Sequence, residues 1–144
     1  MAQRTVLFKG NPVRLEGPEI KAGNKAPEFH VLDDGLKTIT LSDFRGKVRL
    51  IAAVPSLDTQ VCEMETRRFN EEAAKLPDKV AILTVSMDLP FAQKRFCATH
   101  GIERVKILSD HRDASFGKAY GILMPDFRLL ARSIFFIDEQ DTIR

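Results

Sequence analysis

The sequence is poor in cysteine and has no closely spaced cysteine pair. Its only cysteines, Cys62 and Cys97, are 35 residues apart, so no C-x-x-C occurs. Without C-x-x-C, the chain lacks both the ligand spacing of a zinc cluster and the usual motif of dithiol redox proteins. Two cysteines are also too few for a secreted disulfide scaffold. They are therefore either inert core residues or a redox or catalytic pair.

Long apolar runs and an excess of one charge are also missing. No segment approaches the ~20 apolar residues of a membrane-spanning helix, and residues 1–5 lack the apolar core of a secretory signal. The 22 basic and 20 acidic residues give a net charge of +2, which is too balanced to predict nucleic acid or a membrane as a partner. We expect a cytoplasmic protein, with a periplasmic location as the alternative.

Histidine is scarce. The three residues, His30, His100 and His111, have no metal-ligand spacing with one another or with a cysteine, so we expect no metal site.

The overall composition is typical of one globular domain, with 44% hydrophobic and 29% charged residues over 144 positions. A chain of this length needs no disulfide or metal to fold. We therefore expect a single domain over residues 1–144.

Strand-like and helix-like segments alternate along the chain, which predicts an α/β fold. The nearly all apolar, non-alternating runs at 48–54 and 80–85 indicate strands buried on both faces, as in a parallel sheet. Other strands are expected in a hairpin over 5–15 with its turn at 10–12, and over 29–32, 38–41, 105–108 and 133–137. Helices are expected over 59–76, from Pro90 to Gly101 with Asp88 as cap, and over 113–120.

Cys62 falls in the first turn of the helix that follows a buried strand. Such an end of a parallel sheet is where ligands bind in α/β folds. A helix N-terminus carries partial positive charge and unpaired N–H donors, both of which favour the reactive thiolate over the thiol. Thr59, three residues earlier, can direct its hydroxyl toward the sulfur, and Pro55 can rigidify the loop and keep water away. The alternative is that Cys62 is a small buried hydrophobic residue.

The segment around this cysteine resembles a known active site. Residues 55–62, PSLDTQVC, match the P-x-x-x-T-x-x-C motif of peroxiredoxins. Residues 22–29 resemble that family's A-G-x-x-A-P-x-F opening, and 41–47 resemble its L-x-x-F-x-G-K segment. Three further stretches, at 8–13, 88–97 and 130–139, are similar to the thiol peroxidases, which are bacterial atypical two-cysteine peroxiredoxins. The resemblance implies a thioredoxin-like sandwich, with a central mixed sheet flanked by helices and an N-terminal β-hairpin.

The resemblance also implies a role for individual residues. Cys62 corresponds to the peroxidatic cysteine and Cys97 to the resolving cysteine of the same chain. Thr59 and Arg132 correspond to the residues that polarise the peroxide and hold the thiolate, and Pro55 to the residue that shields the site. Without the motif, Arg132 is more simply interpreted as a solvated surface arginine.

The implied activity is a thiol-dependent peroxidase with a role in antioxidant defence. Hydrogen peroxide and alkyl hydroperoxides are the implied substrates, thioredoxin the reductant, and a homodimer the implied assembly; no cofactor is needed. A disulfide requires Cα atoms about 4.4–6.8 Å apart. Since Cys62 begins one helix and Cys97 lies toward the end of another, we expect one or both segments to unwind during turnover.

Two rival interpretations stay open on the sequence. One is a thiol–disulfide exchange protein without a peroxide site, and the other is a binding module with inert cysteines. Phe91 and Phe96 are expected to pack in the core. The chain ends at Arg144, whereas members of the resembled family continue through a strand and a C-terminal helix; we expect these to be missing here.

Overall fold

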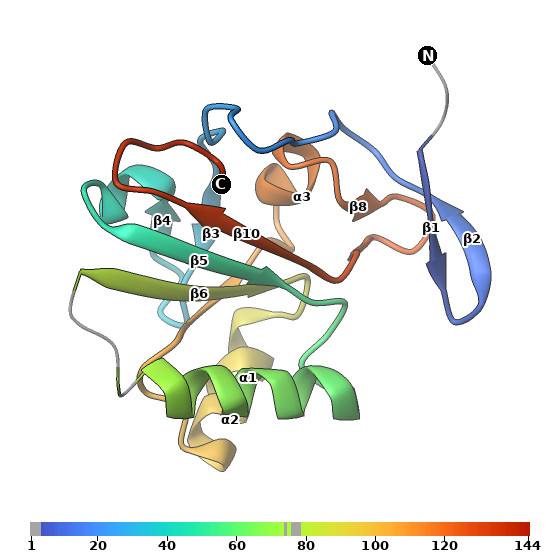
Figure 1. Ribbon diagram of the computed structural model, residues 1–144. Helices are drawn as coiled ribbons and strands as arrows, with labels where there is room; N and C mark the ends of the chain where they lie inside the picture. The colour runs from blue at the N-terminus through green and yellow to red at the C-terminus, as the bar shows by residue number, and fades with distance from the viewer. Residues whose placement is uncertain (1–3, 74, 76–78) are drawn as a thin grey trace.

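The computed structural model describes residues 4–73, 75 and 79–144, apart from the side chains of residues 60–63. At its centre is a mixed six-stranded sheet in the order β10-β5-β6-β7-β3-β4 (Figure 1). In chain order the strands are β3 (His30–Leu32), β4 (Thr38–Thr40), β5 (Val48–Ala53), β6 (Val80–Ser86), β7 (Lys106–Ser109) and β10 (Ser133–Ile137). β5, β6 and β7 are parallel, while β10 and β3 pair antiparallel on the two sides. The predicted mixed sheet is confirmed.

Helices lie on both faces of this sheet. α1 (Gln60–Ala73) and α2 (Pro90–His100) cover one face, and the short α3 (Ser115–Ala119) lies on the other (Figure 1). A 3-10 turn, η1 (Leu41–Phe44), follows β4. Among the described helices, none combines the length and the hydrophobicity that crossing a membrane requires. The predicted end of the first helix, at 77–78, lies outside the described residues.

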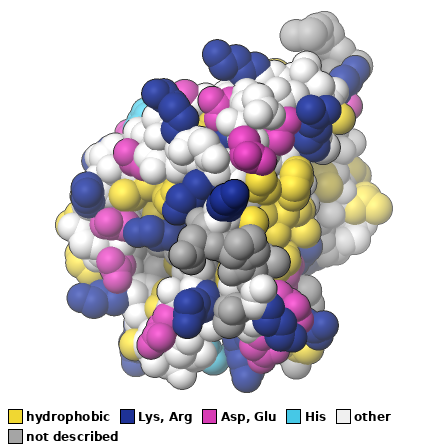
Figure 2. All heavy atoms as spheres, turned by 60° about the vertical axis from the view of Figure 1, so that its left-hand side comes forward, with side chains coloured by type: hydrophobic (Ala, Val, Ile, Leu, Met, Phe, Trp, Pro, Cys, Tyr) yellow, Lys and Arg dark blue, Asp and Glu magenta, His cyan; other side chains and the backbone are white. Residues whose placement is uncertain are grey.

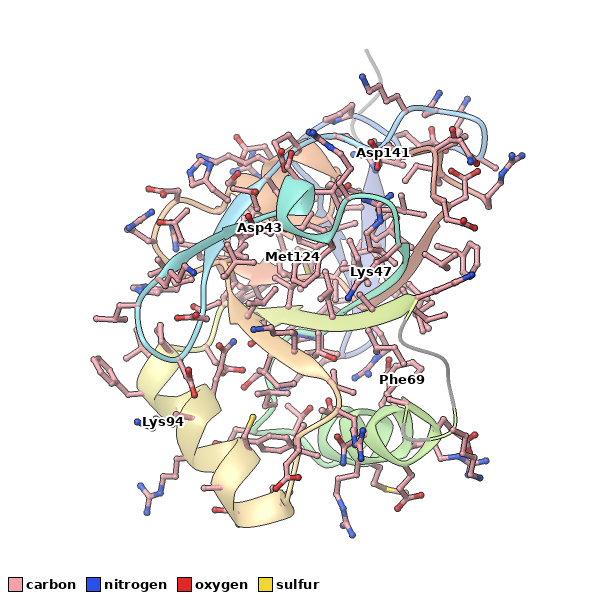
Figure 3. The ribbon with its side chains drawn as sticks, turned by 90° about the vertical axis from the view of Figure 1, so that its left-hand side faces the viewer. Asp43, Lys47, Phe69, Lys94, Met124 and Asp141 are labelled. Carbon is pink, nitrogen blue, oxygen red and sulfur yellow. The ribbon has the colours of Figure 1, made fainter. Side chains whose placement is uncertain are left out.

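The covered faces explain why the central strands are mostly apolar. Ile82 of β6 packs in a cluster beneath α1 and α2, whereas its neighbour Leu83 packs in the larger core on the α3 side. Both are at most 4% exposed. Figure 3 shows Phe69 pointing from α1 toward the sheet, where it joins the first of these clusters. Successive residues of a strand point to opposite faces, so a strand covered on both sides is apolar at most positions. The polar exceptions are Arg49 of β5 and Thr84 and Ser86 of β6, which are also buried.

Two small hairpins lie beside the main sheet: β1 (Thr5–Phe8) with β2 (Asn11–Arg14), and β8 (Leu123–Met124) with β9 (Leu129–Leu130). The first was predicted, but its turn was not placed correctly. The turn residues are Lys9 and Gly10, with φ of 52° and 80°, and Pro12 lies within the second strand. A two-residue turn with positive φ at both positions matches the twist of the strands that it joins. The second hairpin is too short to leave an alternating pattern in the sequence.

Two large apolar side chains of the helices are exposed, and one of them, Phe91, was expected to pack in the core. Met64 of α1 is 61% exposed, and α1 instead buries Thr66, which is 1% exposed. Phe91 of α2 is 67% exposed. Phe91 is exposed because α2 is oriented by the amide of Gln93. Gln93 is 1% exposed and donates a 2.8 Å hydrogen bond to the Leu108 carbonyl oxygen. Residues two apart on a helix point in nearly opposite directions, so burying Gln93 turns Phe91 toward solvent.

α3 begins later than predicted and is anchored by a buried carboxylate. Its first residue is Ser115, because the preceding Ala114 adopts a left-handed conformation with φ of 52°. Asp110, 2% exposed, accepts hydrogen bonds from the backbone N–H groups of Phe116 (3.0 Å) and Gly117 (2.8 Å). Despite these bonds, burial dominates and raises the pKa of Asp110 to about 6.

We predict that Asp110→Asn changes the pH dependence of stability. The pKa of Asp110 is about 6 in the folded protein and about 3.9 in an unfolded chain. As the pH falls from 7 to 5, the folded state therefore takes up a proton that the unfolded state does not. Relative to the variant, the wild type should gain about 1 kcal/mol of unfolding free energy over this interval. Urea unfolding at both pH values measures the gain, and an equal difference at pH 5 and pH 7 would contradict it.

Candidate active site

The loop that precedes α1 leaves the sheet at the carboxyl ends of the parallel strands. β5 ends at Ala53, and the N–H of Val54 still donates to the Val85 carbonyl oxygen at 3.0 Å. Pro55 follows and is buried. α1 begins at Gln60, so Cys62 lies in its first turn, as predicted. The Cys62 side chain is outside the described part of the chain.

A tight turn shapes this loop between Pro55 and the helix. The Thr59 hydroxyl donates to the Ser56 carbonyl oxygen at 3.0 Å, and the N–H of Asp58 donates to the Ser56 hydroxyl oxygen at 3.0 Å. Thr59 is exposed. Its proton is committed to Ser56, so in this arrangement the hydroxyl oxygen is left as an acceptor.

Asp88 does not cap α2, contrary to the prediction. The N-cap is Leu89, whose side chain makes no capping hydrogen bond. The Asp88 carboxylate instead accepts hydrogen bonds from the Ser56 hydroxyl (2.7 Å), the Leu57 N–H (2.8 Å) and the Ser86 hydroxyl (2.7 Å). An acidic residue does lie shortly before the helix, as the sequence pattern indicates. Its carboxylate, however, bonds two donors on another loop, the Ser56 hydroxyl and the Leu57 N–H. Gly101 ends α2 in a left-handed conformation, as predicted.

Cys97 lies in the second half of α2 as a free, half-buried thiol. It lines a small cavity of about 180 Å³ together with Gln93, Lys94 and Ile107. In Figure 3, Lys94 points away from the body of the protein on the same helix. Burial, followed by the negative charge of Asp34, raises the pKa of the Cys97 thiol to about 11.

A separate groove of about 770 Å³ lies between the Ser56–Thr59 turn and α2. Its lining includes Leu57, Asp58, Phe91, Arg95, Phe96 and Thr99. The face of α2 that borders the turn is therefore formed by a different set of side chains from the face that carries Cys97. Cys97 instead packs against the cluster beneath α1 and α2, which includes Leu57 and Phe69.

Arg132 is brought to the Cys62 helix by strand pairing. β10 lies beside β5 with Ser133 opposite Ala53, which places Arg132 next to the start of the loop. Its guanidinium donates a 2.6 Å hydrogen bond to Glu65, one turn after Cys62 on α1. The Glu65 side chain is 20% exposed, and its second oxygen is buried with no hydrogen-bond partner among the described residues. The sequence analysis missed Glu65, although its position three residues after Cys62 places it on the same side of a helix.

The family model described as Redoxin matches residues 21–144. The chain belongs to the redoxin family. Thiol peroxidases are among its relatives: that of Halalkalibacterium halodurans is 60% identical over 139 residues, which cover 96% of this chain and 83% of that protein. The thiol peroxidase of Bacillus subtilis is 54% identical, with 96% and 82% covered.

Solved structures agree with this assignment. A peroxiredoxin-like protein from Aquifex aeolicus superposes with a TM-score of 0.89 at 45% identity, over 97% of this chain and 82% of that one. The thiol peroxidase from Chromobacterium violaceum, at 23% identity, shares the fold with a TM-score of 0.83, over 96% and 82%. The redoxin chain is thus a peroxiredoxin-type peroxidase, which reduces peroxides with a thiol. The expected family and fold class are confirmed.

The surface of this redoxin carries mixed charge. Figure 2 shows basic and acidic side chains interspersed over the face that it presents. This agrees with the balanced count of 22 basic and 20 acidic residues.

We predict that Cys97 is alkylated slowly in the folded protein. With Cys62 replaced by serine, iodoacetamide at pH 7.5 should modify Cys97 about a hundredfold more slowly than in guanidinium chloride. The reason is that a pKa near 11 leaves about a hundredth of the thiolate that an unperturbed thiol has. Intact mass against time gives both rates. A native rate within tenfold of the unfolded rate would show that Cys97 is accessible and ionised.

Proposed function

We propose that the thiolate of Cys62 is the nucleophile of this peroxidase. The supporting observation is its place in the first turn of α1, at the carboxyl ends of parallel strands. Arg132, which precedes β10, is held against the same helix by its hydrogen bond to Glu65. The sulfur attacks the distal oxygen of a hydroperoxide and the O–O bond breaks. Cys62 becomes a sulfenic acid, and the released alkoxide or hydroxide takes a proton from water to give an alcohol or water.

Three neighbours assist this step in the proposal. Arg132 places positive charge where the leaving oxygen becomes negative, which is the main way such a transition state is stabilised. Thr59 offers its hydroxyl oxygen to the peroxide proton while its own proton stays on Ser56. Pro55, which is buried, excludes water from one side of the loop.

Cys97 then resolves the sulfenic acid. Its sulfur attacks the Cys62 sulfur, a disulfide forms within the chain, and one water leaves. Cys97 is half-buried in the second half of α2, whereas Cys62 lies in the first turn of α1. In the proposal, α2, the first turn of α1, or both open to bring the Cα atoms within about 4.4–6.8 Å. An external dithiol protein, by the family resemblance thioredoxin, reduces the disulfide by exchange. Homodimer formation and a role in antioxidant defence are also predictions of that resemblance.

The peroxidase chemistry is tested by peroxide titration of the fully reduced protein without any partner protein. We expect the wild type to lose two hydrogens per equivalent of peroxide, and Cys97→Ser to accumulate a trappable sulfenic acid on Cys62, both read from intact mass. Oxidation by peroxide alone also separates a peroxidase from a thiol–disulfide exchange protein. No mass change within minutes of equimolar peroxide would contradict the assignment of both cysteines.

We further predict that Arg132→Lys slows the oxidation of Cys62. Lysine keeps the charge but loses the planar fork that can bond Glu65 and a peroxide oxygen together. The second-order rate constant should fall about tenfold or more, measured by quenched mass spectrometry in the Cys97→Ser background. Arg68→Lys is the matched control, since Arg68 pairs with Glu72 on the exposed side of α1. Equal rates for the two lysine variants would argue against a role for Arg132.

A further inference from the structure

The carboxylate of Asp88 joins two loops that are 31 to 32 residues apart in sequence. We propose that Asp88 is a positioning residue for the peroxidase reaction, and that it fixes the loop from which the Cys62 helix starts. This role rests on the proposed function of Cys62. It differs from that of Arg132 and Thr59, because Asp88 acts on the loop and not on the peroxide.

The contacts with the loop fix both its place and its rotation. One carboxylate oxygen accepts from the Ser56 hydroxyl at 2.7 Å, and the other from the Leu57 N–H at 2.8 Å. Leu57 is 3% exposed, so its N–H cannot turn to bulk water if the carboxylate is removed. A buried donor left without a partner is costly, and the segment must rearrange to satisfy it. Cys62 follows Leu57 by only five residues.

Asp88 is itself held from two elements, β6 and β7, and a third, α2, fixes its partner on β6. The Ser86 hydroxyl of β6 donates to its carboxylate at 2.7 Å, and the Ser109 hydroxyl of β7 donates to its backbone carbonyl oxygen at 2.6 Å. Ser86 in turn accepts a 3.0 Å hydrogen bond from Gln93 of α2. Ser86, Ser109 and Gln93 are each at most 1% exposed. The carboxylate is therefore a preorganised anchor on the rigid sheet.

The same chain of hydrogen bonds reaches the helix that carries the second cysteine. Gln93 lies one helical turn before Cys97 and lines the same cavity. The series of hydrogen bonds Gln93–Ser86–Asp88–Ser56 therefore connects the helix of Cys97 with the loop that precedes the helix of Cys62. A misplacement of about 1 Å of a reacting group can slow a reaction a hundredfold, so this anchor is expected to control the rate of the first chemical step.

The test measures the second-order rate constant of Cys62 oxidation by hydrogen peroxide in the Cys97→Ser parent, where resolution cannot interfere. Asp88→Ala should lower this constant about tenfold or more. Asp88→Asn should stay within about threefold of the parent, because its amide oxygen can accept from Leu57 and its amide nitrogen can donate to the Ser56 hydroxyl. Asp126→Ala is the matched control, since it removes a carboxylate that pairs with Arg14 on the surface at 3.1 Å, and it should react at the parent rate.

The outcomes separate the two proposals. A parent that is not oxidised at Cys62 overturns the peroxidatic role itself and this inference with it. A reactive parent with a folded Asp88→Ala variant of equal rate, within twofold, overturns the positioning role and leaves the peroxidase chemistry intact. The positioning role is also overturned if Asp88→Asn is as slow as Asp88→Ala, because a correctly placed amide should restore the loop.

Circular dichroism and thermal melting check that each variant folds. If Asp88→Ala is unfolded, Ser56→Ala decides the matter, because it removes one of the two loop donors and keeps the carboxylate. We then expect a fall of about threefold to fivefold in the rate constant. A Ser56→Ala rate equal to that of the parent would overturn the inference.

Discussion

The parallel pairing of β5 with β6 is the constraint on which the rest of the site depends. Ala53 lies opposite Val85, and the Val54 N–H continues the pairing at 3.0 Å. The loop toward α1 therefore leaves the sheet beside the end of β6. Asp88 lies there, two residues after the last residue of β6. On the other side of β5, the antiparallel register of β10 places Arg132 at the same edge of the sheet. The groups that act on the Cys62 helix thus meet through strand register and not through closeness in sequence.

Ser86, Ser109 and Gln93 at this edge are buried, and their pairing decides whether they stabilise the fold. An unpaired buried hydroxyl or amide is costly, whereas a connected set of hydrogen bonds in a low dielectric rigidifies its surroundings. Ser86 both donates to Asp88 and accepts from Gln93, and Ser109 donates to the backbone of Asp88. Each group is therefore fixed by another, and the arrangement leaves the loop before α1 few alternative positions.

The sequence predicts the elements of this fold better than it predicts their contacts. The strands at 48–54 and 80–85, the helix start near Cys62 and the end of α2 at Gly101 follow from local patterns, and the structure has them. Asp88 was interpreted as a helix cap because only its neighbours in sequence were visible. Two of its three donors, Ser56 and Leu57, lie more than 30 residues away, and no local pattern carries that information.

The same limitation explains the errors within the helices. Met64 is apolar and spaced as a core residue, yet the orientation of α1 buries Thr66 instead. Phe91 is exposed because α2 is oriented by the hydrogen bonds of Gln93, a polar residue that hydrophobic spacing ignores. For the site, the motif gave the positions of Pro55, Thr59 and Cys62 along the chain. The ion pair between Arg132 and Glu65 depends on the order of strands in the sheet.

The two thiols are placed in opposite electrostatic settings, and this difference can order the proposed cycle. Cys62 lies at a helix N-terminus, whose partial positive charge favours an anion. Cys97 lies in the second half of α2, where burial and Asp34 raise its pKa to about 11. In the proposed cycle, Cys62 is therefore the thiol that meets the peroxide first. The opening of α2 that the proposed cycle requires would then expose Cys97, remove the burial that raises its pKa and bring it within reach, so that one movement would supply both the approach and the reactivity of the second thiol.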